Sequence, residues 1–142
     1  MTRALNAPIL EFLSGGPHFA TIATIDPDGS PRQAVIWYRL DGDAIVINSL
    51  VGRRWPSNLL RDPRISVAIT DRDDGLRWVG VTGTAEPIRD QPTAQADIAE
   101  MAQRYHAHEP GEADRLVAER FSRQERISFR VRAASVHDHL DD

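Results

Sequence analysis

The sequence contains no cysteine, and this absence excludes several kinds of chemistry at once. Disulfide bonds, thiolate nucleophiles and cysteine-ligated zinc or iron–sulfur sites all require that residue. No uninterrupted apolar run approaches the roughly 18 residues of a membrane-spanning helix, and the first residues lack the apolar segment of a signal peptide. We therefore expect a cytoplasmic protein that makes no use of a membrane.

A large excess of charge of either sign is also missing. The net charge is −4, with 27% charged and 41% hydrophobic residues. This balance is typical of a globular protein and argues against a nucleic-acid surface as the main function. The 142 residues fit one domain, which would bury about two thirds of its unfolded surface. We expect a single domain over residues 1–142.

The order of apolar patterns and turn residues predicts a mainly β protein. Helices are expected over Pro8–Leu13, from Pro56 to the pair Asp62-Pro63, over Gln91–His108 and over Glu112–Phe121. Strands are expected over His18–Ile25, Gln33–Leu40, Ala44–Asn48, Ile65–Thr70, Arg77–Ile88 and Arg126–Val136. Tight turns join most of these six strands, which favours an antiparallel barrel over a parallel sheet.

The most informative segment follows the third expected strand and runs from Asn48 to Arg64. It contains a glycine, the adjacent pair Arg53 and Arg54, and Pro56. Proline is favoured at the first helical position, because the N–H that it lacks would have no intrahelical partner there. A helix starting at Pro56 would direct free N–H groups and a positive dipole end towards both arginines. The segment predicts an anion site, above all for phosphate; the alternative is a surface connection with solvated arginines.

Four motifs support a more specific interpretation. They are Ala23-Thr24-Ile25-Asp26-Pro27-Asp28-Gly29-Ser30-Pro31, Val35-Ile36-Trp37-Tyr38, Gly52-Arg53 through Asn58-Leu59-Leu60-Arg61-Asp62-Pro63-Arg64, and Val81-Thr82-Gly83-Thr84-Ala85-Glu86. In this order, they resemble the flavin/deazaflavin oxidoreductases of the pyridoxamine 5′-phosphate oxidase-like split β-barrel superfamily. The resemblance covers roughly residues 8 to 90 and is greatest to the branch that uses coenzyme F420. It implies a homodimeric split β-barrel with two cofactor sites at the subunit interface.

The resemblance also implies an activity. An F420-dependent reductase would transfer a hydride between the deazaflavin and a small organic acceptor. In such enzymes the coenzyme carries the hydride, while the protein supplies binding, orientation and electrostatics, so no catalytic side chain is expected. An FMN-binding oxidoreductase and a non-catalytic flavin or deazaflavin carrier are the alternatives, because the loop motif would be the same in each.

The cofactor-binding residues follow from the resemblance, motif by motif. Asn48, Ser49 and Leu50 would lie beside the ring and its ribityl chain, and Arg53 and Asn58 would approach the phosphate. Three residues would flank the ring on the second strand, namely Pro31, Gln33 and Val35.

Trp55 departs from the pattern, because many relatives have a lysine at this position. Phosphate binding would then rely on Arg53, on Arg54 and on the helix N-terminus, while Trp55 is expected to cover the cofactor. Packing in the core or at the dimer interface is the alternative for Trp55. Trp78 matches an aromatic position near the substrate side, with a core position as its alternative. Trp37 is expected to be structural.

The histidines do not predict a metal site. His137 and His139 are two residues apart, as in some metal pairs, but they lie in the expected C-terminal tail and no third ligand is recognisable. The acidic cluster around Arg72 is explained by turn formation.

Overall fold

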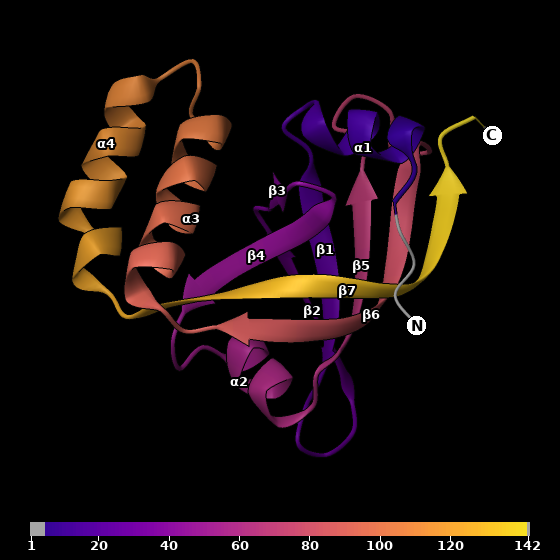
Figure 1. Ribbon diagram of the computed structural model, residues 1–142, viewed down its shortest axis with the longest axis horizontal. Helices are drawn as coiled ribbons and strands as arrows, with labels where there is room; N and C mark the ends of the chain where they lie inside the picture. The colour runs from indigo at the N-terminus through magenta and orange to yellow at the C-terminus, as the bar shows by residue number, and fades with distance from the viewer. Residues whose placement is uncertain (1–4, 142) are drawn as a thin grey trace.

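The computed structural model describes residues 5–141, which form one antiparallel sheet with flanking helices (Figure 1). In chain order the elements are α1 (Ala7–Ser14), β1 (Phe19–Ile25), β2 (Pro31–Ile36), β3 (Arg39–Asp41), β4 (Ala44–Leu50), α2 (Arg54–Arg61), β5 (Arg64–Thr70), β6 (Trp78–Ile88), α3 (Gln91–Tyr105), α4 (Pro110–Glu119), the 3₁₀ turn η1 (Phe121–Arg123) and β7 (Arg126–His139). The expected mainly β, antiparallel fold is confirmed. The described chain has seven strands, however, where six were expected.

The strand order in the sheet is β2-β1-β5-β6-β7-β4-β3. The long strands β6 and β7 bend along their length, so that β4 lies across the layer formed by β1 and β5 (Figure 1). The register between the two strands shifts between Thr82 and Gly83, where β7 has one extra residue, Ala134. A Cβ at Gly83 would lie 1.9 Å from the carbonyl oxygen of Arg132. Only glycine therefore allows the two backbones to approach so closely here.

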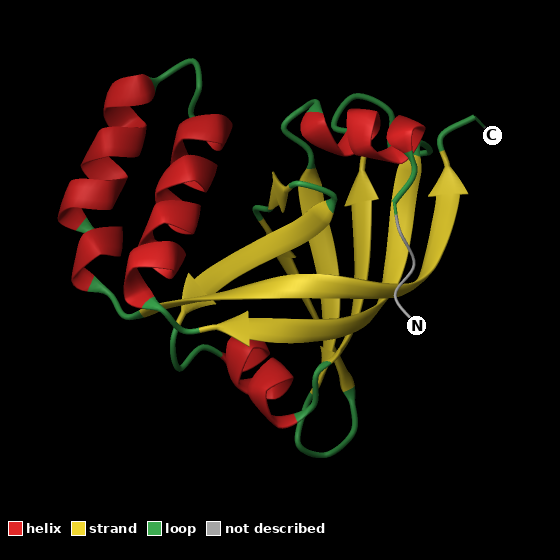
Figure 2. Cartoon of the chain, in the orientation of Figure 1, coloured by secondary structure: helices red, strands yellow, loops and turns green. Residues whose placement is uncertain are grey.

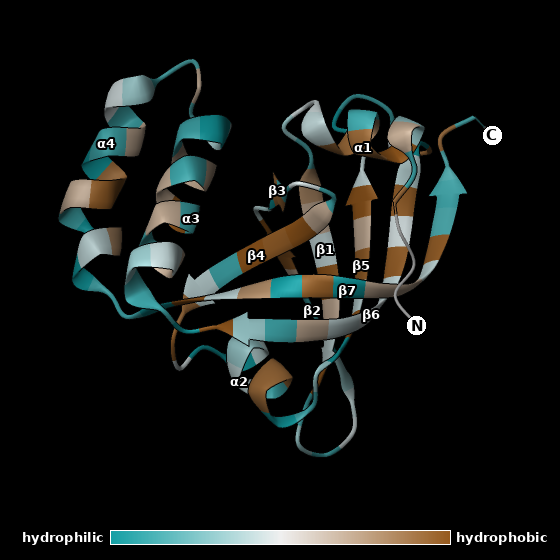
Figure 3. Ribbon diagram, in the orientation of Figure 1, coloured by the Kyte–Doolittle hydropathy of each residue, from teal (hydrophilic) through white to brown (hydrophobic). Residues whose placement is uncertain are grey.

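The main apolar core fills the inside of the curved sheet. Alternate residues point inwards, as Ala20 and Ile22 do on β1 and Ile65, Val67 and Ile69 do on β5. A second, smaller cluster joins β4 to α3 and η1, and contains Val46, Ile98, Met101 and Phe121. Figure 3 shows the hydrophobic colouring concentrated on β4 and alternating along β5.

The helices surround the sheet (Figure 2). Helices α1 and α2 lie at opposite ends of the β1–β5 layer, and α3 and α4 lie side by side beyond β4 (Figure 1). No helix in the part of the chain described is long and apolar enough to cross a membrane.

The strand expected over Gln33–Leu40 is wrong, because it is divided into β2 and β3. At the break, the N–H of Tyr38 donates to Tyr105 Oη at 3.3 Å. The carbonyl of Tyr38 accepts from Arg104 Nη1 at 2.8 Å. Side chains from the end of α3 thus take the backbone bonds that a continuous strand would have used, which creates the seventh strand.

Several boundaries also differ from expectation, among them the end of α3 at Tyr105 and the bounds of α4. The expected C-terminal tail is wrong for His137 and His139, because β7 continues to His139 and pairs it with Trp78. Helix α2 starts at Arg54, two residues before Pro56. Proline is still tolerated there, because the first-turn N–H groups of a helix have no intrahelical partners. As a result Arg53 is the N-cap residue, while Arg54 already belongs to the helix.

Candidate functional site

The loop between β4 and α2 places Arg53 at the mouth of a cavity. Gly52 adopts a φ of 97°, which favours glycine, and the N–H of Arg53 donates to the Leu50 carbonyl at 3.3 Å. Within the described part of the chain, no side chain caps the N-terminus of α2. The start of this helix therefore keeps unsatisfied N–H groups and a positive dipole end next to Arg53.

The cavity has a volume of about 260 Å³ and is called the Arg126 pocket below. It lies where the ends of β2 and β4, the start of α2, the inner side of α3 and the η1 turn meet. Its lining residues are Val35, Ile36, Trp37, Asn48, Ser49, Leu50, Arg53, Trp55, Ile98, Met101, Arg120, Phe121, Gln124 and Arg126. The lining contains three arginines and no carboxylate.

Arg126 is the most unusual of these residues, because its side chain is a buried cation without a counter-charge among the residues that the structure describes. The residue is 7% exposed. Its Nε donates to Asn48 Oδ1 at 3.0 Å and its Nη1 to Gln124 Oε1 at 2.7 Å. Both acceptors are neutral amide oxygens. Burial first, and then the neighbouring cations Arg53 and Arg120, lower the pKa of Arg126 to about 10.

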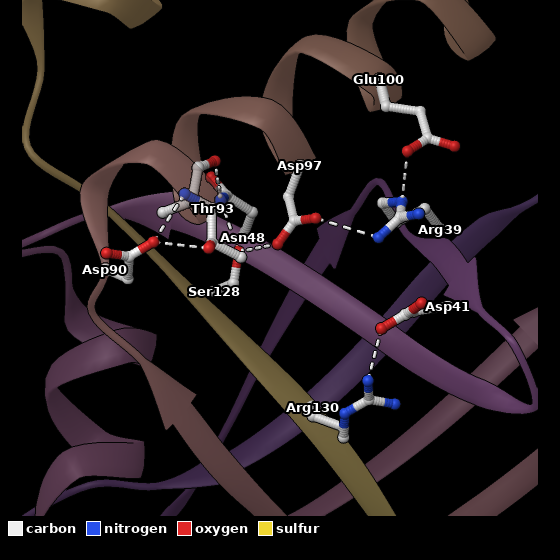
Figure 4. Close-up of polar contacts among 10 residues, drawn as sticks. Arg39, Asp41, Asn48, Asp90, Thr93, Asp97, Glu100, Ser128 and Arg130 are labelled. Carbon is white, nitrogen blue, oxygen red and sulfur yellow. Dashed lines mark hydrogen bonds and ion pairs between the residues drawn. The ribbon is translucent and has the colours of Figure 1, made fainter.

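A hydrogen-bond network from α3 fixes the orientation of Asn48 (Figure 4). Asn48 Nδ2 donates to the Ala94 carbonyl and to Ser128 Oγ, both at 2.9 Å. Ser128 Oγ in turn donates to Asp97 Oδ2 at 2.6 Å. Because both amide hydrogens of Asn48 are used, its Oδ1 must face Arg126. Asn48 therefore positions the arginine, and its side chain has no donor left for a ligand.

The end of β4 offers other polar groups. The Ser49 side chain is 6% exposed, and its hydroxyl has no hydrogen-bond partner among residues 5–141. Strand β3 pairs only with Ala44, Ile45 and Val46 of β4. Beyond Val46, the described sheet has no strand on that side of β4. The Ser49 hydroxyl and this backbone edge are therefore available to a bound molecule.

Aromatic and apolar side chains form the remaining walls. The Trp37 ring stacks on Tyr105, with centroids 5.1 Å apart, and meets Phe121 edge-on. Trp55 is 8% exposed and packs against Phe129 with ring centroids 5.8 Å apart. Trp55 thus belongs to the main core, while part of it lines the pocket. The packing in the core agrees with the structural alternative, and the covering of a cofactor by Trp55 stays a prediction.

The structure brings together six of the residues expected to bind a cofactor, and separates the other five. The residues that line the Arg126 pocket are Val35, Asn48, Ser49, Leu50, Arg53 and Trp55. Arg54 and Asn58 line a different hollow on the other side of the α2 N-terminus. Pro31, Gln33 and Trp78 line neither of the two.

The second hollow contains its own counter-charges. Asp26, Asp28, Arg32 and Arg61 line it together with Arg54 and Asn58. Asn58 Nδ2 donates to Asp26 Oδ1 at 2.9 Å and to Thr24 Oγ1 at 3.1 Å. The bond from Asn58, helped by Arg32, lowers the pKa of the Asp26 carboxyl. Asn58 therefore ties α2 to the turn after β1, and this hollow is the less positive of the two.

Trp78 takes part in a separate contact at the far ends of β6 and β7. Its ring stacks on His139 with centroids 4.2 Å apart and lies over Gly80, where a Cβ would meet the ring at 2.7 Å. Within residues 5–141, no group of three or more metal-ligating side chains is placed to hold a metal.

Sequence reasoning missed Arg126, Arg120, Gln124 and the α3 residues of the pocket. From the sequence, Arg126 is only the first residue of the strand expected over Arg126–Val136. Its importance arises from register, because it pairs with Leu50 at the end of β4. The sequence signal that points to it is an arginine at the first residue of an otherwise apolar-faced strand, which is a weak signal.

Comparisons with known proteins agree with this architecture. A solved structure of a conserved hypothetical protein from Mycobacterium tuberculosis is 25% identical, with a TM-score of 0.77 over 97% of this chain and 87% of that one. A structure described as an F420 reductase is 21% identical, with a TM-score of 0.71 over 94% and 98% of the two chains. HutZ, the heme storage protein from Vibrio cholerae, is 15% identical, with a TM-score of 0.65 over 96% and 95%.

No match was found among curated proteins. The family described as pyridoxamine 5′-phosphate oxidase matches residues 5–139, which is almost the whole chain. The order of the strands, the loop between β4 and α2, and this match lead to one conclusion. The chain belongs to the pyridoxamine 5′-phosphate oxidase family and has the split β-barrel fold of that family.

Proposed function

We propose that this protein is an F420-dependent oxidoreductase, which transfers a hydride between the deazaflavin coenzyme and a small organic acceptor. The observation that carries the proposal is the Arg126 pocket, which combines three arginines without a carboxylate and a wall of aromatic residues. A deazaflavin nucleotide has both parts to match, namely a planar ring system and a phosphate. Family membership and the F420 reductase among the structural neighbours support the same choice.

The residues of the pocket fit such a group in their chemistry. The free edge of β4 beyond Val46 and the Ser49 hydroxyl would bind the polar edge of a ring. Trp37 and Met101 would cover the ring faces, and Arg53 with the N-terminus of α2 would hold the phosphate. When bound, the coenzyme supplies the hydride, and the chain binds it, orients it and excludes water.

We further propose that the protein acts as a homodimer with the cofactor sites at the interface. The outward side of β1 and β5 has the small residues Thr21 and Ala68 in register, next to the exposed apolar side chain of Phe19. On the neighbouring strand β2, Val35 is 69% exposed although it also lines the Arg126 pocket. A second copy seated on this surface would cover Val35 and would border the pocket.

Binding titrations of the purified chain with F420 and with FMN, side by side, test the cofactor. We expect the tighter affinity for F420. Tighter binding of FMN, or a yellow protein after purification, would assign the chain to the FMN-dependent oxidoreductases. Hemin belongs in the same series, because one structural neighbour is a heme storage protein.

A second measurement separates an enzyme from a carrier. Reduced F420 is mixed with a panel of small organic acceptors, and its oxidation is followed with and without protein. An enzyme accelerates the oxidation with one or more acceptors. A protein that binds F420 but leaves every rate unchanged would be a carrier, and the catalytic part of the proposal would be rejected.

A further inference from the structure

The charge of the buried Arg126 side chain is not balanced by any anionic side chain among residues 5–141. A buried cation is normally paired with an anion, since removing the charge from water is costly. Arg126 is 7% exposed, and no carboxylate forms an ion pair with it among residues 5–141. Its Nε and Nη1 bind neutral amide oxygens, and its Nη2 has no hydrogen-bond partner in the described chain.

Two further guanidinium groups increase the positive charge at this point. Arg53 is the N-cap residue of α2, and Arg120 is the C-cap residue of α4. Both are exposed, both line the same pocket as Arg126, and neither forms an ion pair within the described residues. The loop before α2 and the segment from the end of α4 to the start of β7 thus bring together three cations that have no ion pair within the described residues. An exposed arginine without an ion pair is stabilised by water, but the buried Arg126 side chain is largely removed from water.

The Arg126 side chain is also held in a fixed position. Gln91 binds the backbone of Arg126 on both sides, accepting from its N–H at 3.0 Å and donating to its carbonyl at 2.7 Å. Asn48 and Gln124 fix the guanidinium plane, which lies 5.0 Å over the Phe121 ring. A guanidinium that is fixed in this way loses little conformational entropy when it binds a planar oxyanion.

We propose that Arg126, Arg53 and Arg120 form an anion clamp, which holds a carboxylate or phosphate group of the molecule bound in the pocket. Nη2 of Arg126 would bind the oxyanion from the floor of the pocket, and the two exposed arginines would close on it from the rim. The rest of the ligand lies against Trp37 and Met101. The identity of that ligand rests on the proposed function, whereas the clamp is tested without turnover.

The test measures the melting temperature of the full chain in rising inorganic phosphate, with sodium chloride keeping the ionic strength constant. Phosphate binding to the folded state raises the melting temperature. We expect this rise in the wild-type protein and its loss in Arg126→Gln. The affinity for phosphate should fall about tenfold or more, as for lost charge-assisted hydrogen bonds. Arg123→Gln, an exposed arginine on η1 outside the pocket, is the matched control and should respond like the wild type.

Exposed variants keep the test valid if Arg126→Gln does not fold. The double variant Arg53→Gln with Arg120→Gln changes only rim residues and should also bind phosphate more weakly. Adding a saturating amount of F420, or of FMN if the titrations show that FMN is the cofactor that binds, then identifies the source of the oxyanion. If the bound cofactor abolishes the response to phosphate, the cofactor's phosphate occupies the clamp; if the response persists, the clamp holds an anionic substrate.

Failure of the clamp and failure of the cofactor proposal give different results. A chain that binds neither F420 nor FMN, but binds phosphate through Arg126, retains the clamp and loses the proposed cofactor. A wild-type protein that does not respond to phosphate would overturn the clamp. So would folded Arg126→Gln and rim variants that respond as strongly as Arg123→Gln.

Discussion

At the scale of single residues, Arg53 and Arg54 are a natural matched pair. They are adjacent in sequence, yet Arg53 lines the Arg126 pocket and Arg54 lines the hollow next to Asp26. If the cofactor phosphate lies in the Arg126 pocket, Arg53→Ala should weaken F420 binding by about 1.5–3 kcal/mol, the usual range for hydrogen bonds to charged groups. Arg54→Ala should leave the affinity almost unchanged. If Arg54→Ala weakens binding more than Arg53→Ala does, the phosphate is assigned to the second hollow instead.

We expect a substitution of Trp55 to lower the stability of the fold and to leave the ligand preference unchanged. It is 8% exposed and packs against Phe129 in the main core. Trp55→Lys removes this packing and places a charge in apolar surroundings. We expect a loss of about 3–5 kcal/mol in the free energy of unfolding, the range known for large aromatic deletions. Urea unfolding measures this loss, and Trp55→Phe should retain most of the stability. A Trp55→Lys protein as stable as the wild type would contradict the core assignment.

At the scale of elements, Tyr105 joins the end of α3 to the sheet. Its hydroxyl accepts from the Tyr38 N–H and donates to the His18 carbonyl. Burial raises the pKa of Tyr105 to about 12, above the value of about 10 for an unfolded chain. A raised acid pKa means that the protein favours the neutral phenol. The stabilisation is therefore complete below pH about 10 and is lost as the pH rises through about 12.

Tyr105→Phe provides the control for this pH dependence. It removes both hydrogen bonds and should cost about 1–3 kcal/mol at neutral pH, because a buried donor and acceptor lose their partner. Chemical unfolding at a series of alkaline pH values should show a smaller decline for this variant than for the wild type. Tyr38 remains and also has a raised pKa, so the decline should not disappear. Equal pH profiles for the two proteins would refute the role of Tyr105.

The elements themselves could largely be predicted from the sequence, because most of the information is local. Alternating apolar residues predicted β5 and β7, and a segment rich in Thr, Ile and Ala predicted β1. Turn residues such as Asp26 and Gly29 separated the strands. The division at Tyr38 could not be predicted, since it depends on Arg104 and Tyr105, more than sixty residues away. The extension of β7 to His139 likewise depends on pairing with Trp78.

At the scale of the whole molecule, only part of the candidate site could be predicted from the sequence. A loop with Gly52 and adjacent arginines is a continuous segment, and its geometry follows from local rules. Arg126 and Arg120 enter the pocket through strand register and helix packing, which no local pattern specifies. A site assembled from distant segments can therefore be predicted from sequence only where one of its segments carries a contiguous motif.

The last prediction concerns the proposed homodimer. The outward side of β1 and β5 has the small residues Thr21 and Ala68 paired at its middle, next to the exposed Phe19. Ala68→Glu places a charge in the middle of this surface and should convert a dimer into a folded monomer, because the charge would be buried without a partner. Ala118→Glu, on the exposed side of α4, is the matched control and should remain dimeric. Sedimentation measures the oligomeric state of both variants, and circular dichroism checks that they are folded.

Cofactor affinity should fall together with dimerisation in Ala68→Glu, because the pocket borders Val35 and the proposed interface. A wild-type chain that sediments as a monomer at micromolar concentration, or an Ala68→Glu monomer that binds the cofactor normally, would place the complete site within one subunit.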